Sequence, residues 1–414
     1  MVESAAETRQ MGKKQVGFLM FLCWFSYTCA YLGRLNYSAN LVQIVEELGI
    51  TKAQGGLVAS FFFFSYGAGQ IIHGMLNKYY KPRWIIAAGL ILSAIWNMLM
   101  PFVSLNVMMV LWMFNGLTQS VLWTTFTRVL SMYLDDQALK KAVIVMGTCV
   151  ATGTCLIYGI SALFVEFLNW RFSFYFASLI LLIAGLLWFF GYGSVTRGVA
   201  PRVAVAVKGK EKQKKASSSG LILFFAVIFL FSALHHLIKD GLVTWTPSIF
   251  YELYGLPESY SILLTLGLPL LSLPSSIWCV QMNRKYKDHI TLCGFFFAFS
   301  LIFTAIMVVC MPLNIWWITL ICFAVAVLAM SALNNVITSL IPLQMRDRVD
   351  SAKTAGFVNA FCYLGSTIAT YALGALADGF GWYSIFYLVL ILTAVSVLVS
   401  VIYLPLKKKY PIDN

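Results

Sequence analysis

Two basic side chains, Arg34 and Lys239, lie inside long apolar stretches and occupy equivalent places in an internal repeat. The segment from Arg34 to Leu48 has a faint copy 205 residues further on, from Lys239 to Leu253. A charged side chain at bilayer depth costs at least ~2.5–3.5 kcal/mol unless it faces a polar cavity or a partner. Two facing cations suit a phosphate or a carboxylate, which an arginine can contact through two parallel hydrogen bonds. The pair predicts a central anion site shared by the two halves.

Two further charged side chains lie in apolar surroundings. Asp240 follows Lys239 directly, and a carboxylate there could take up and release protons or serve as a fixed ion-pair partner of Arg34 or Lys239. The sequence leaves these two roles open. Arg128 lies a turn or two from the end of the fourth apolar segment. We expect a structural or gating role for Arg128, through neighbouring carboxylates or backbone carbonyls.

Polar and aromatic side chains on the same segments could line the cavity. Tyr31 is the strongest of these candidates because it lies one helical turn from Arg34 on the same face. His236 lies within a turn of Lys239 and is a candidate for proton coupling, although a buried histidine more often makes a structural hydrogen bond. The remaining candidates for substrate contact are Tyr66, Gln70, Trp123 and Tyr363.

Motifs of enzymes and of ATP-driven pumps are not evident in the sequence. We find no phosphate-binding glycine loop, no cluster with metal-ligand spacing and no Ser/His/Asp constellation. The nine cysteines include no CxxC pair and are odd in number, so they indicate neither a disulfide framework nor a metal site. We therefore expect no enzymatic activity, no cofactor and no metal.

The composition is that of a membrane protein. Hydrophobic residues make up 60% of the chain and charged residues only 11%, whereas charged residues account for about 25% of a soluble domain. The 414 residues suffice for a dozen spans of about 20 residues each. Twelve apolar segments begin near Val16, Gly55, Trp84, Val107, Ala142, Phe172, Gly220, Tyr260, Ile290, Leu313, Thr354 and Trp382. We expect an all-α membrane protein with twelve transmembrane helices.

The basic residues predict the orientation of these spans. Of the 29 Lys and Arg residues, 24 fall in the two chain ends and in the loops that follow even-numbered spans. The opposite loops hold only Lys52 and Arg171, beside several carboxylates. The positive-inside rule then places both termini in the cytoplasm. The net charge of +13 therefore reflects membrane topology and does not indicate a nucleic-acid partner.

The longest polar interruption divides the spans six and six. It predicts an N-terminal six-helix bundle over residues 1–194, a cytoplasmic linker over 195–219 and a C-terminal six-helix bundle over 220–414. Two parallel repeats of six spans are typical of major facilitator transporters, which bind substrate near the bilayer midplane between the repeats.

The chain resembles the organophosphate:phosphate antiporter family of the major facilitator superfamily, which includes bacterial glycerol-3-phosphate and hexose-phosphate transporters. The blocks that carry the resemblance are Tyr31-Leu-Gly-Arg34-Leu-Asn36, Ser65-Tyr66-Gly67, Gln119 with Trp123 and Arg128, Lys239-Asp-Gly241 with Trp245-Thr-Pro247, and Tyr363-Leu-Gly365 with Phe380-Gly-Trp382. The resemblance implies alternating access, with an organic phosphate exchanged for inorganic phosphate across a bacterial inner membrane. It also implies that Arg34 and Lys239 stand where two arginines grip the substrate phosphate. By the same matching, Tyr31, Tyr66, Trp123 and Tyr363 correspond to cavity-lining positions.

Three departures from that family concern the charge of the site. Where that family has a lysine in the second span, this chain has Gln70. The family's fifth-span histidine aligns with Ala151, and its seventh-span arginine is replaced by Lys239, which is followed by Asp240. One cation fewer or one carboxylate more can shift the preference between a dianion and a monoanion. Proton-coupled transport of a carboxylate or another non-phosphorylated solute through Asp240 therefore remains an alternative. A sensor that binds a sugar phosphate without transporting it is a less favoured alternative. A monomer suffices for either carrier mechanism, with the small anion, phosphate or protons, and the lipid bilayer as partners.

Overall fold

The computed structural model describes residues 11–201, 218–286, 288–345 and 351–409. In these ranges the regular elements are all helices, and twelve helical segments are long and apolar enough to cross a membrane. A 25-residue helix is about 37 Å long, which exceeds the thickness of a bilayer's hydrocarbon core. The expectation of an all-α protein with twelve transmembrane helices is confirmed.

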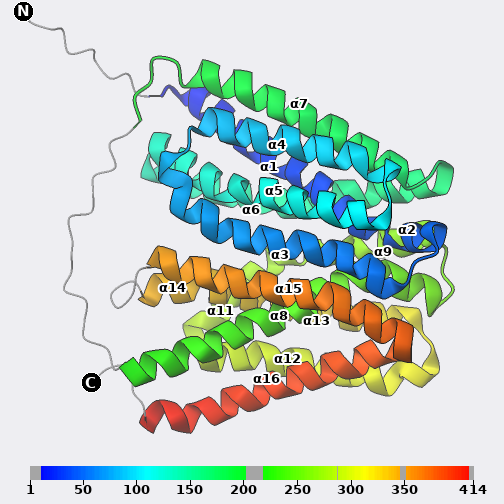
Figure 1. The fold of residues 1–414 in the computed structure, drawn as a ribbon. Coiled ribbons are helices and arrows are strands. Elements are labelled where there is room, and N and C mark those ends of the chain that lie inside the picture. The colour runs from blue at the N-terminus through cyan, green and yellow to red at the C-terminus, as the bar shows by residue number, and fades with distance from the viewer. Residues whose placement is uncertain (1–10, 202–217, 287, 346–350, 410–414) are drawn as a thin grey trace, which may run out of the picture.

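The first six spans form one group of helices and the last six form another, and Figure 1 shows the two groups one above the other. We call them the N-terminal and C-terminal halves. The N-terminal half contains α1 (Lys13–Ala39), α2 (Leu41–Leu48), α3 (Lys52–Leu76), η1 (Asn77–Tyr79), α4 (Pro82–Leu99), η2 (Met100–Phe102), α5 (Leu105–Tyr133), α6 (Asp136–Phe167) and α7 (Arg171–Val195). Most of the expected linker, residues 195–219, lies outside the described residues.

The C-terminal half follows the same plan with more interruptions. Its eighth span is built from three consecutive helices, and its tenth ends in a short π-helix. The half contains α8 (Ser218–Glu252), α9 (Glu258–Thr265), α10 (Gly267–Leu270), α11 (Ser272–Lys285), α12 (His289–Cys310), η3 (Met311–Leu313), α13 (Trp316–Asn335), η4 (Val336–Leu340), α14 (Ile341–Gln344), α15 (Ser351–Phe380) and α16 (Tyr383–Lys409).

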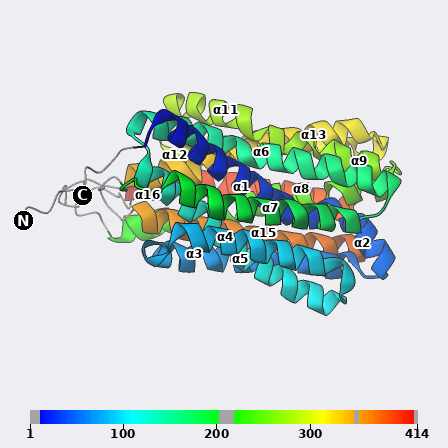
Figure 2. The ribbon, with the colours of Figure 1, turned by 90° about the horizontal axis from the view of Figure 1, so that it is seen from above.

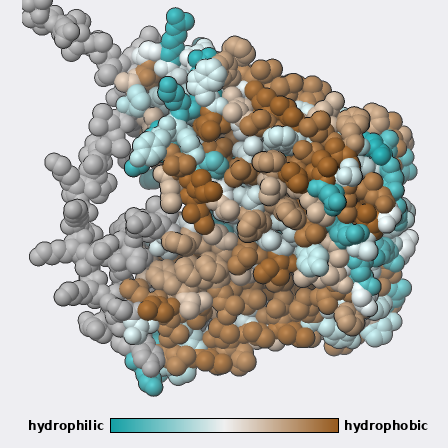
Figure 3. Space-filling model, in the orientation of Figure 1, coloured by the Kyte–Doolittle hydropathy of each residue, from teal (hydrophilic) through white to brown (hydrophobic). Residues whose placement is uncertain are grey.

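The surface is arranged for a lipid environment. Large apolar side chains are exposed along the sides of the bundle, among them Phe64, Phe190 and Val309. Figure 3 shows this apolar surface, with hydrophilic residues gathered towards its two ends. In Figures 1 and 2, α1 begins and α16 ends at one end of the bundle. We call this the basic end, because α16 finishes there in Lys407, Lys408 and Lys409, and we call the opposite one the acidic end.

The apolar character of the first segment continues past Arg34 to Val45, but the structure does not form one uninterrupted helix over it. Helix α1 ends at Ala39, so Arg34 lies in its last two turns, and α2 begins after Asn40. The side chain of Asn40 donates to the carbonyl of Asn36, at 2.6 Å, and to the hydroxyl of Ser161, at 3.2 Å. An asparagine that bonds its own backbone competes with helix continuation, and the α1–α2 break falls at this residue. In the other half α8 is continuous past Lys239, to Glu252.

The two halves pack together through α3 against α15 and through α6 against α9 and α10. At Gly56 on α3, an added Cβ would lie 2.0 Å from the carbonyl oxygen of Thr370 on α15. Close to it, the hydroxyl of Ser60 lies 2.7 Å from the carbonyl oxygen of Thr367 and 2.7 Å from the hydroxyl of Thr370. Small residues let membrane helices approach to backbone contact in this way.

An ion-pair cluster joins the halves at the acidic end. Lys52, at the start of α3, lies 3.0 Å from Glu252 and 3.9 Å from Asp378 of the C-terminal half. Asp378 also accepts hydrogen bonds from the backbone N–H groups of Lys52 and Ala53, at 3.1 and 2.8 Å. Further hydrogen bonds between the halves, from Ser60 to Thr367 and from Ser259 to Glu166, lie between the middle of the bundle and this end. The structure is therefore closed at the acidic end.

The internal repeat places an equivalent carboxylate in the N-terminal half, where its partners differ. Glu47 accepts from the indole of Trp170 at 2.6 Å and pairs with Arg171, also at 2.6 Å, and both partners belong to the same half. Hydrogen bonds from Arg171 hold the pKa of Glu47 below its ordinary value. This contribution to stability is present at neutral pH and is lost as the pH falls through the acidic range. The repeat-related Glu252 keeps the indole contact, through Trp382, but its cation comes from the other half.

Candidate anion-binding cavity

A cavity of about 170 Å³ lies between the two halves. The N-terminal half contributes side chains from α1, α3 and α6, and the C-terminal half contributes α8, α10, α11, α13 and α15. The polar and aromatic wall residues are Tyr31, Arg34, Phe63, Thr154, Tyr158, His236, Lys239, Asp240, Thr244, Ser272, Ser331 and Tyr363. The structure thus brings Arg34 and Lys239 to the walls of one cavity.

Arg34 is a buried cation without a counter-ion among the described residues. It is only 6% exposed, and its Nε donates to Oε1 of Gln119 at 3.3 Å. Its guanidinium lies 4.3 Å from the ring centroid of Tyr66 and 4.6 Å from that of Tyr31. Its Nη2 has no hydrogen-bond partner in the described part of the chain. Aromatic faces offset part of the desolvation of a cation, but a buried unpaired N–H remains unfavourable until an acceptor binds it.

Gln119 orients Arg34 through a network that sequence reasoning missed. Its amide nitrogen lies 2.9 Å from the hydroxyl of Ser93 and 3.2 Å from Oδ1 of Asn115, to which it donates. Asn115 in turn donates to the carbonyl of Gly33 at 2.8 Å. These bonds tie α1 to α4 and α5 beside the arginine. The available signal was a series of isolated amides and hydroxyls in apolar segments, but the sequence does not show which of them meet.

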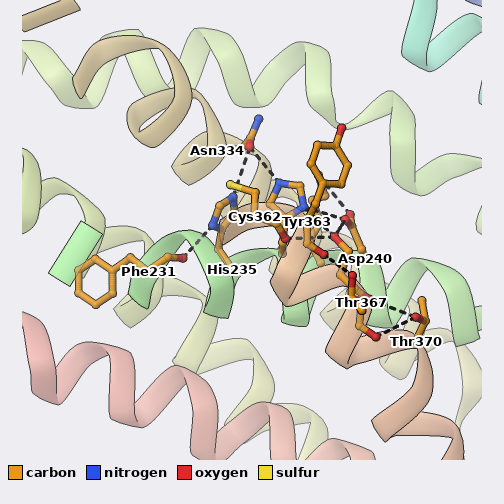
Figure 4. Close-up of polar contacts among 11 residues, drawn as sticks. Phe231, His235, Asp240, Asn334, Cys362, Tyr363, Thr367 and Thr370 are labelled. Carbon is orange, nitrogen blue, oxygen red and sulfur yellow. Dashed lines mark hydrogen bonds and ion pairs between the residues drawn. The ribbon is translucent and has the colours of Figure 1, made fainter. Parts of the chain in front are cut away.

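Lys239 and Asp240 form a second charged group on the opposite wall. The Nζ of Lys239 lies 3.4 Å from Oδ1 of Asp240. Oδ2 of Asp240 accepts from the hydroxyl of Ser366 at 2.5 Å and lies 2.7 Å from Nδ1 of His236. Figure 4 shows Asp240 among the polar contacts where α8 meets α15. Asp240 therefore offsets part of the positive charge of Lys239, whereas Arg34 has no such partner.

Aromatic rings from both halves close one side of the cavity. The rings of Tyr66 and Tyr363 lie 4.7 Å apart between centroids, and those of Phe63 and Tyr363 lie 6.4 Å apart. Tyr66 itself is fully buried behind the wall, where it contacts Arg34. A Cβ at Gly67 would lie 2.8 Å from that of Tyr363, so these helices are in close contact beside the rings.

Besides Tyr66, three of the residues that sequence reasoning selected do not line the cavity. Gln70 is buried, and its amide lies 3.5 Å from the carbonyl of Ser120. Trp123 packs against the ring of Tyr27, at 5.1 Å between centroids. Arg128 donates to backbone carbonyls of the loop after α3, including that of Tyr80 at 3.2 Å. The contacts of Arg128 are those of a side chain that fixes a loop.

Tyr158 on α6 is a wall residue that sequence reasoning did not select. It is fully buried, it lines the cavity, and its hydroxyl has no hydrogen-bond partner among the described residues. Thr154, one turn earlier on the same helix, also lines the cavity. The unpaired hydroxyl of Tyr158 and the unpaired Nη2 of Arg34 are two donors that an anion in this cavity could satisfy.

We expect Tyr158→Phe to weaken anion binding about 10- to 150-fold, because a hydrogen bond to a charged group contributes about 1.5–3 kcal/mol. Stability without ligand should not fall, because the substitution removes a buried hydroxyl that lacks a partner. Thermal unfolding at increasing phosphate concentrations measures both quantities. Tyr371→Phe, on an exposed face of α15, serves as the matched control. Equal anion affinity in the Tyr158 variant and the unmodified protein would contradict the assignment.

Comparison with known proteins identifies the superfamily. The family model described as Major Facilitator Superfamily matches residues 23–349. A bacterial homologue of the human lysosomal transporter Spinster, in an inward-facing and occupied conformation, superposes with a TM-score of 0.74 at 12% identity. The match covers 94% of this chain and 97% of that one. This likeness concerns the fold.

Relatives in sequence carry the names expected from the resemblance. A "Probable hexose phosphate transport protein" of Chlamydia pneumoniae is 21% identical over 95% of this chain and 92% of its own length. The "Glycerol-3-phosphate transporter" of Bacillus subtilis is 24% identical over 87% of this chain and 85% of its own. A third relative, a "Probable hexose phosphate transport protein" of Chlamydia muridarum, is matched over only 40% of its own length.

These matches confirm three expectations from the sequence. They are the twelve-span architecture with two pseudo-symmetric bundles, the resemblance to organophosphate carriers, and the expectation that the protein is a transporter rather than an enzyme. The chain belongs to the Major Facilitator Superfamily.

Proposed function

We propose that this protein is a secondary transporter that carries a small anionic, phosphorylated metabolite by alternating access, in exchange for inorganic phosphate. One observation carries the proposal: Arg34 is buried on the cavity wall with an unpaired Nη2 and no described carboxylate beside it. An uncompensated buried charge is strongly unfavourable, so the site gains most from a ligand that brings negative charge. The names of the relatives favour a phosphorylated ligand.

The two halves each contribute one cation to the cavity. An anion bound to both Arg34 and Lys239 would link the halves and favour a closed intermediate. Without an anion, the guanidinium must stay desolvated while the halves change position, which raises the barrier to switching. This difference favours exchange of one anion for another over net movement of a single solute. The domain boundaries at residues 194 and 220 and the site residues named above are part of this proposal.

We place the basic end of the bundle in the cytoplasm, as the positive-inside rule requires. Both termini are then cytoplasmic, and the protein spans the plasma membrane of a bacterium. Since the structure is closed at the acidic end, through Lys52, Glu252 and Asp378, it would be closed towards the outside.

Purified protein in liposomes tests the proposal. Vesicles loaded with inorganic phosphate should take up labelled glycerol 3-phosphate or hexose 6-phosphate, and vesicles loaded with sulfate should not. A protonophore should leave the exchange unchanged. Lack of phosphate-dependent uptake for every organic phosphate tested would overturn the proposal. Transport by the purified protein would also exclude a sensor that does not transport.

Two contacts of Asp240 favour a second candidate, proton-coupled uptake of a carboxylate. Asp240 contacts His236 and Lys239 within the cavity wall, so a proton could be exchanged among these side chains while a monoanion binds Arg34. This candidate predicts uptake into phosphate-free vesicles that is driven by an acidic exterior and abolished by the protonophore. The same liposome experiment therefore separates the two candidates.

The ion-pair cluster at the acidic end should bias the orientation of the carrier. We expect Lys52→Ala to favour opening at that end by about 2- to 5-fold, because part-exposed ion pairs contribute about 0.2–1 kcal/mol. Hydrogen–deuterium exchange in peptides covering residues 49–57 and 372–380 measures the opening, and both should exchange faster. Arg171→Ala breaks the equivalent pair within one half and should leave these peptides unchanged. Equal effects of the two substitutions would contradict a role of Lys52 in closure.

A further inference from the structure

Two histidines and a cysteine form a buried cluster at the inner wall of the C-terminal half. His235 and His236 are neighbours on α8, and Cys362 lies on α15. Their nitrogen and sulfur atoms lie within 4.8 Å of one another, and all three residues are buried. Sequence reasoning found no metal-ligand spacing because Cys362 follows His236 by 126 residues, so only the packing of α15 on α8 brings them together.

The hydrogen bonds of the two imidazoles fix where their protons lie. Nδ1 of His235 is 2.8 Å from the carbonyl oxygen of Phe231, and Nδ1 of His236 is 2.7 Å from Oδ2 of Asp240. A carbonyl or carboxylate oxygen only accepts, so both Nδ1 atoms donate. In neutral imidazoles both Nε2 atoms then carry lone pairs. Metal-binding histidines usually have this arrangement, with one ring nitrogen donating to an oxygen and the other free for the metal.

Both Nε2 atoms point to the same place. Nε2 of His235 lies 3.3 Å from Oδ1 of Asn334, and Nε2 of His236 lies 3.2 Å from the same oxygen. Figure 4 shows these contacts converging on Asn334, with the sulfur of Cys362 beside them. Two imidazole nitrogens, an amide oxygen and a thiol thus lie close together. All are acceptors or metal ligands, so a cation placed among them satisfies them together.

We propose that His235, His236 and Cys362 bind one zinc-class divalent ion, with the amide oxygen of Asn334 as the fourth ligand. Nitrogen and thiolate ligands in a four-coordinate site suit Zn²⁺ and Co²⁺. They disfavour Mg²⁺ and Ca²⁺, which prefer oxygen ligands. Bond lengths of about 2.0–2.3 Å place tetrahedral ligands about 3.3–3.6 Å apart, so the most distant pair, at up to 4.8 Å now, would have to approach by about 1.2 Å. The ion enters from the anion cavity, because His236 is part of its wall.

The position of this site limits its effect on the carrier. Its ligands lie on α8, α13 and α15, all in the C-terminal half, so a bound ion does not link the two halves. A divalent ion and one thiolate add a single net positive charge about one helical turn from Lys239. The metal site therefore raises the positive charge of the cavity without hindering its opening. It does not depend on which anion is carried.

Cobalt spectroscopy of the purified full-length chain, prepared without a histidine tag, tests the proposal. One equivalent of Co²⁺ should give the intense visible bands of a tetrahedral four-coordinate site, together with a thiolate-to-cobalt charge-transfer band. Zn²⁺ should displace both. Cys362→Ser should abolish the charge-transfer band, and His235→Gln and His236→Gln should each weaken binding by about tenfold or more. Cys279→Ser, at a buried cysteine on α11, should leave the spectrum unchanged.

Two outcomes overturn the proposal. One is the lack of stoichiometric Co²⁺ and Zn²⁺ binding, which means that the Asn334 amide is turned so that its NH₂ group donates to both Nε2 atoms. The other is a thiolate band that persists in Cys362→Ser. Asn334→Asp provides a test that does not remove a ligand: an added carboxylate should tighten Zn²⁺ binding, whereas equal or weaker binding contradicts the site. Metal-free thermal unfolding of each variant confirms that it is folded.

Discussion

Replacing Arg34 with methionine should abolish anion binding and transport while leaving the ligand-free protein at least as stable as the original. Arg34 is buried and lines the cavity, and its Nη2 has no partner among the described residues. Losing one partner of a buried charge pair costs about 2–5 kcal/mol, so anion affinity should fall at least ~30-fold. Without ligand, the same substitution removes an uncompensated buried charge and keeps a side chain of similar length.

Thermal unfolding and liposome uptake measure the two parts of this prediction. The unmodified protein should gain ~2.7 kcal/mol from an anion at 100 times its dissociation constant, and at the same concentration Arg34→Met should gain less than ~0.9 kcal/mol. Arg34→Lys keeps the charge but loses the geometry of the contact with Gln119, so we expect intermediate binding. A variant that still shows phosphate-dependent uptake near the original rate would remove Arg34 from the site. Arg171→Met, at the surface of the acidic end, is the control for loss of charge.

Replacing Gly56 with leucine should stop transport by preventing closure at the acidic end, whereas Arg34→Met prevents anion binding. A Cβ at this position would lie 2.0 Å from the carbonyl oxygen of Thr370 and 3.0 Å from the indole of Trp245. Backbone carbonyls cannot move aside as flexible side chains do, so α3 and α15 must separate near the acidic end. The closed arrangement seen here then becomes inaccessible. We expect uptake to fall at least about tenfold while the protein still binds phosphate.

The same helix supplies a matched control for this prediction. Gly74 also lies on α3, but a Cβ added there meets nothing within 4 Å. Gly74→Leu should therefore transport normally. Hydrogen–deuterium exchange should be faster near residues 49–57 in Gly56→Leu and unchanged in Gly74→Leu. Normal uptake by Gly56→Leu would show that closure at this contact is not part of the transport cycle.

Much of the fold could be predicted from the sequence because the bilayer imposes strong constraints. Apolar segments of about 20 residues must be helices in a membrane, so composition and segment length predict twelve spans, and the structure and the comparisons confirm them. The break after α1 was not predicted. It depends on Asn40, whose side chain bonds Asn36 and Ser161, and the apolar pattern of the neighbouring residues continues across it.

The charged residues of the cavity could be selected from the sequence for a related reason. A charge inside an apolar segment must face a cavity or a partner, and this reasoning selects Arg34, Lys239 and Asp240, which the structure places on one wall or the other. Uncharged polar residues carry a weaker signal. Gln70 and Trp123 have the residue types of a binding site but pack elsewhere, whereas Tyr158 does line the cavity. The direction in which each side chain points depends on the helix packing.

The different partners of Glu47 and Glu252 have a consequence for how such a carrier can evolve. Of these two repeat-related carboxylates, Glu47 is held by a cation of its own half and Glu252 by a cation of the opposite half. In the alternating-access mechanism proposed above, substitutions at Lys52 or Asp378 should therefore change how long the carrier dwells in each orientation, and neither residue lines the anion cavity. Turnover and substrate preference are thereby separated onto different residues, and natural selection can adjust one while the other stays fixed.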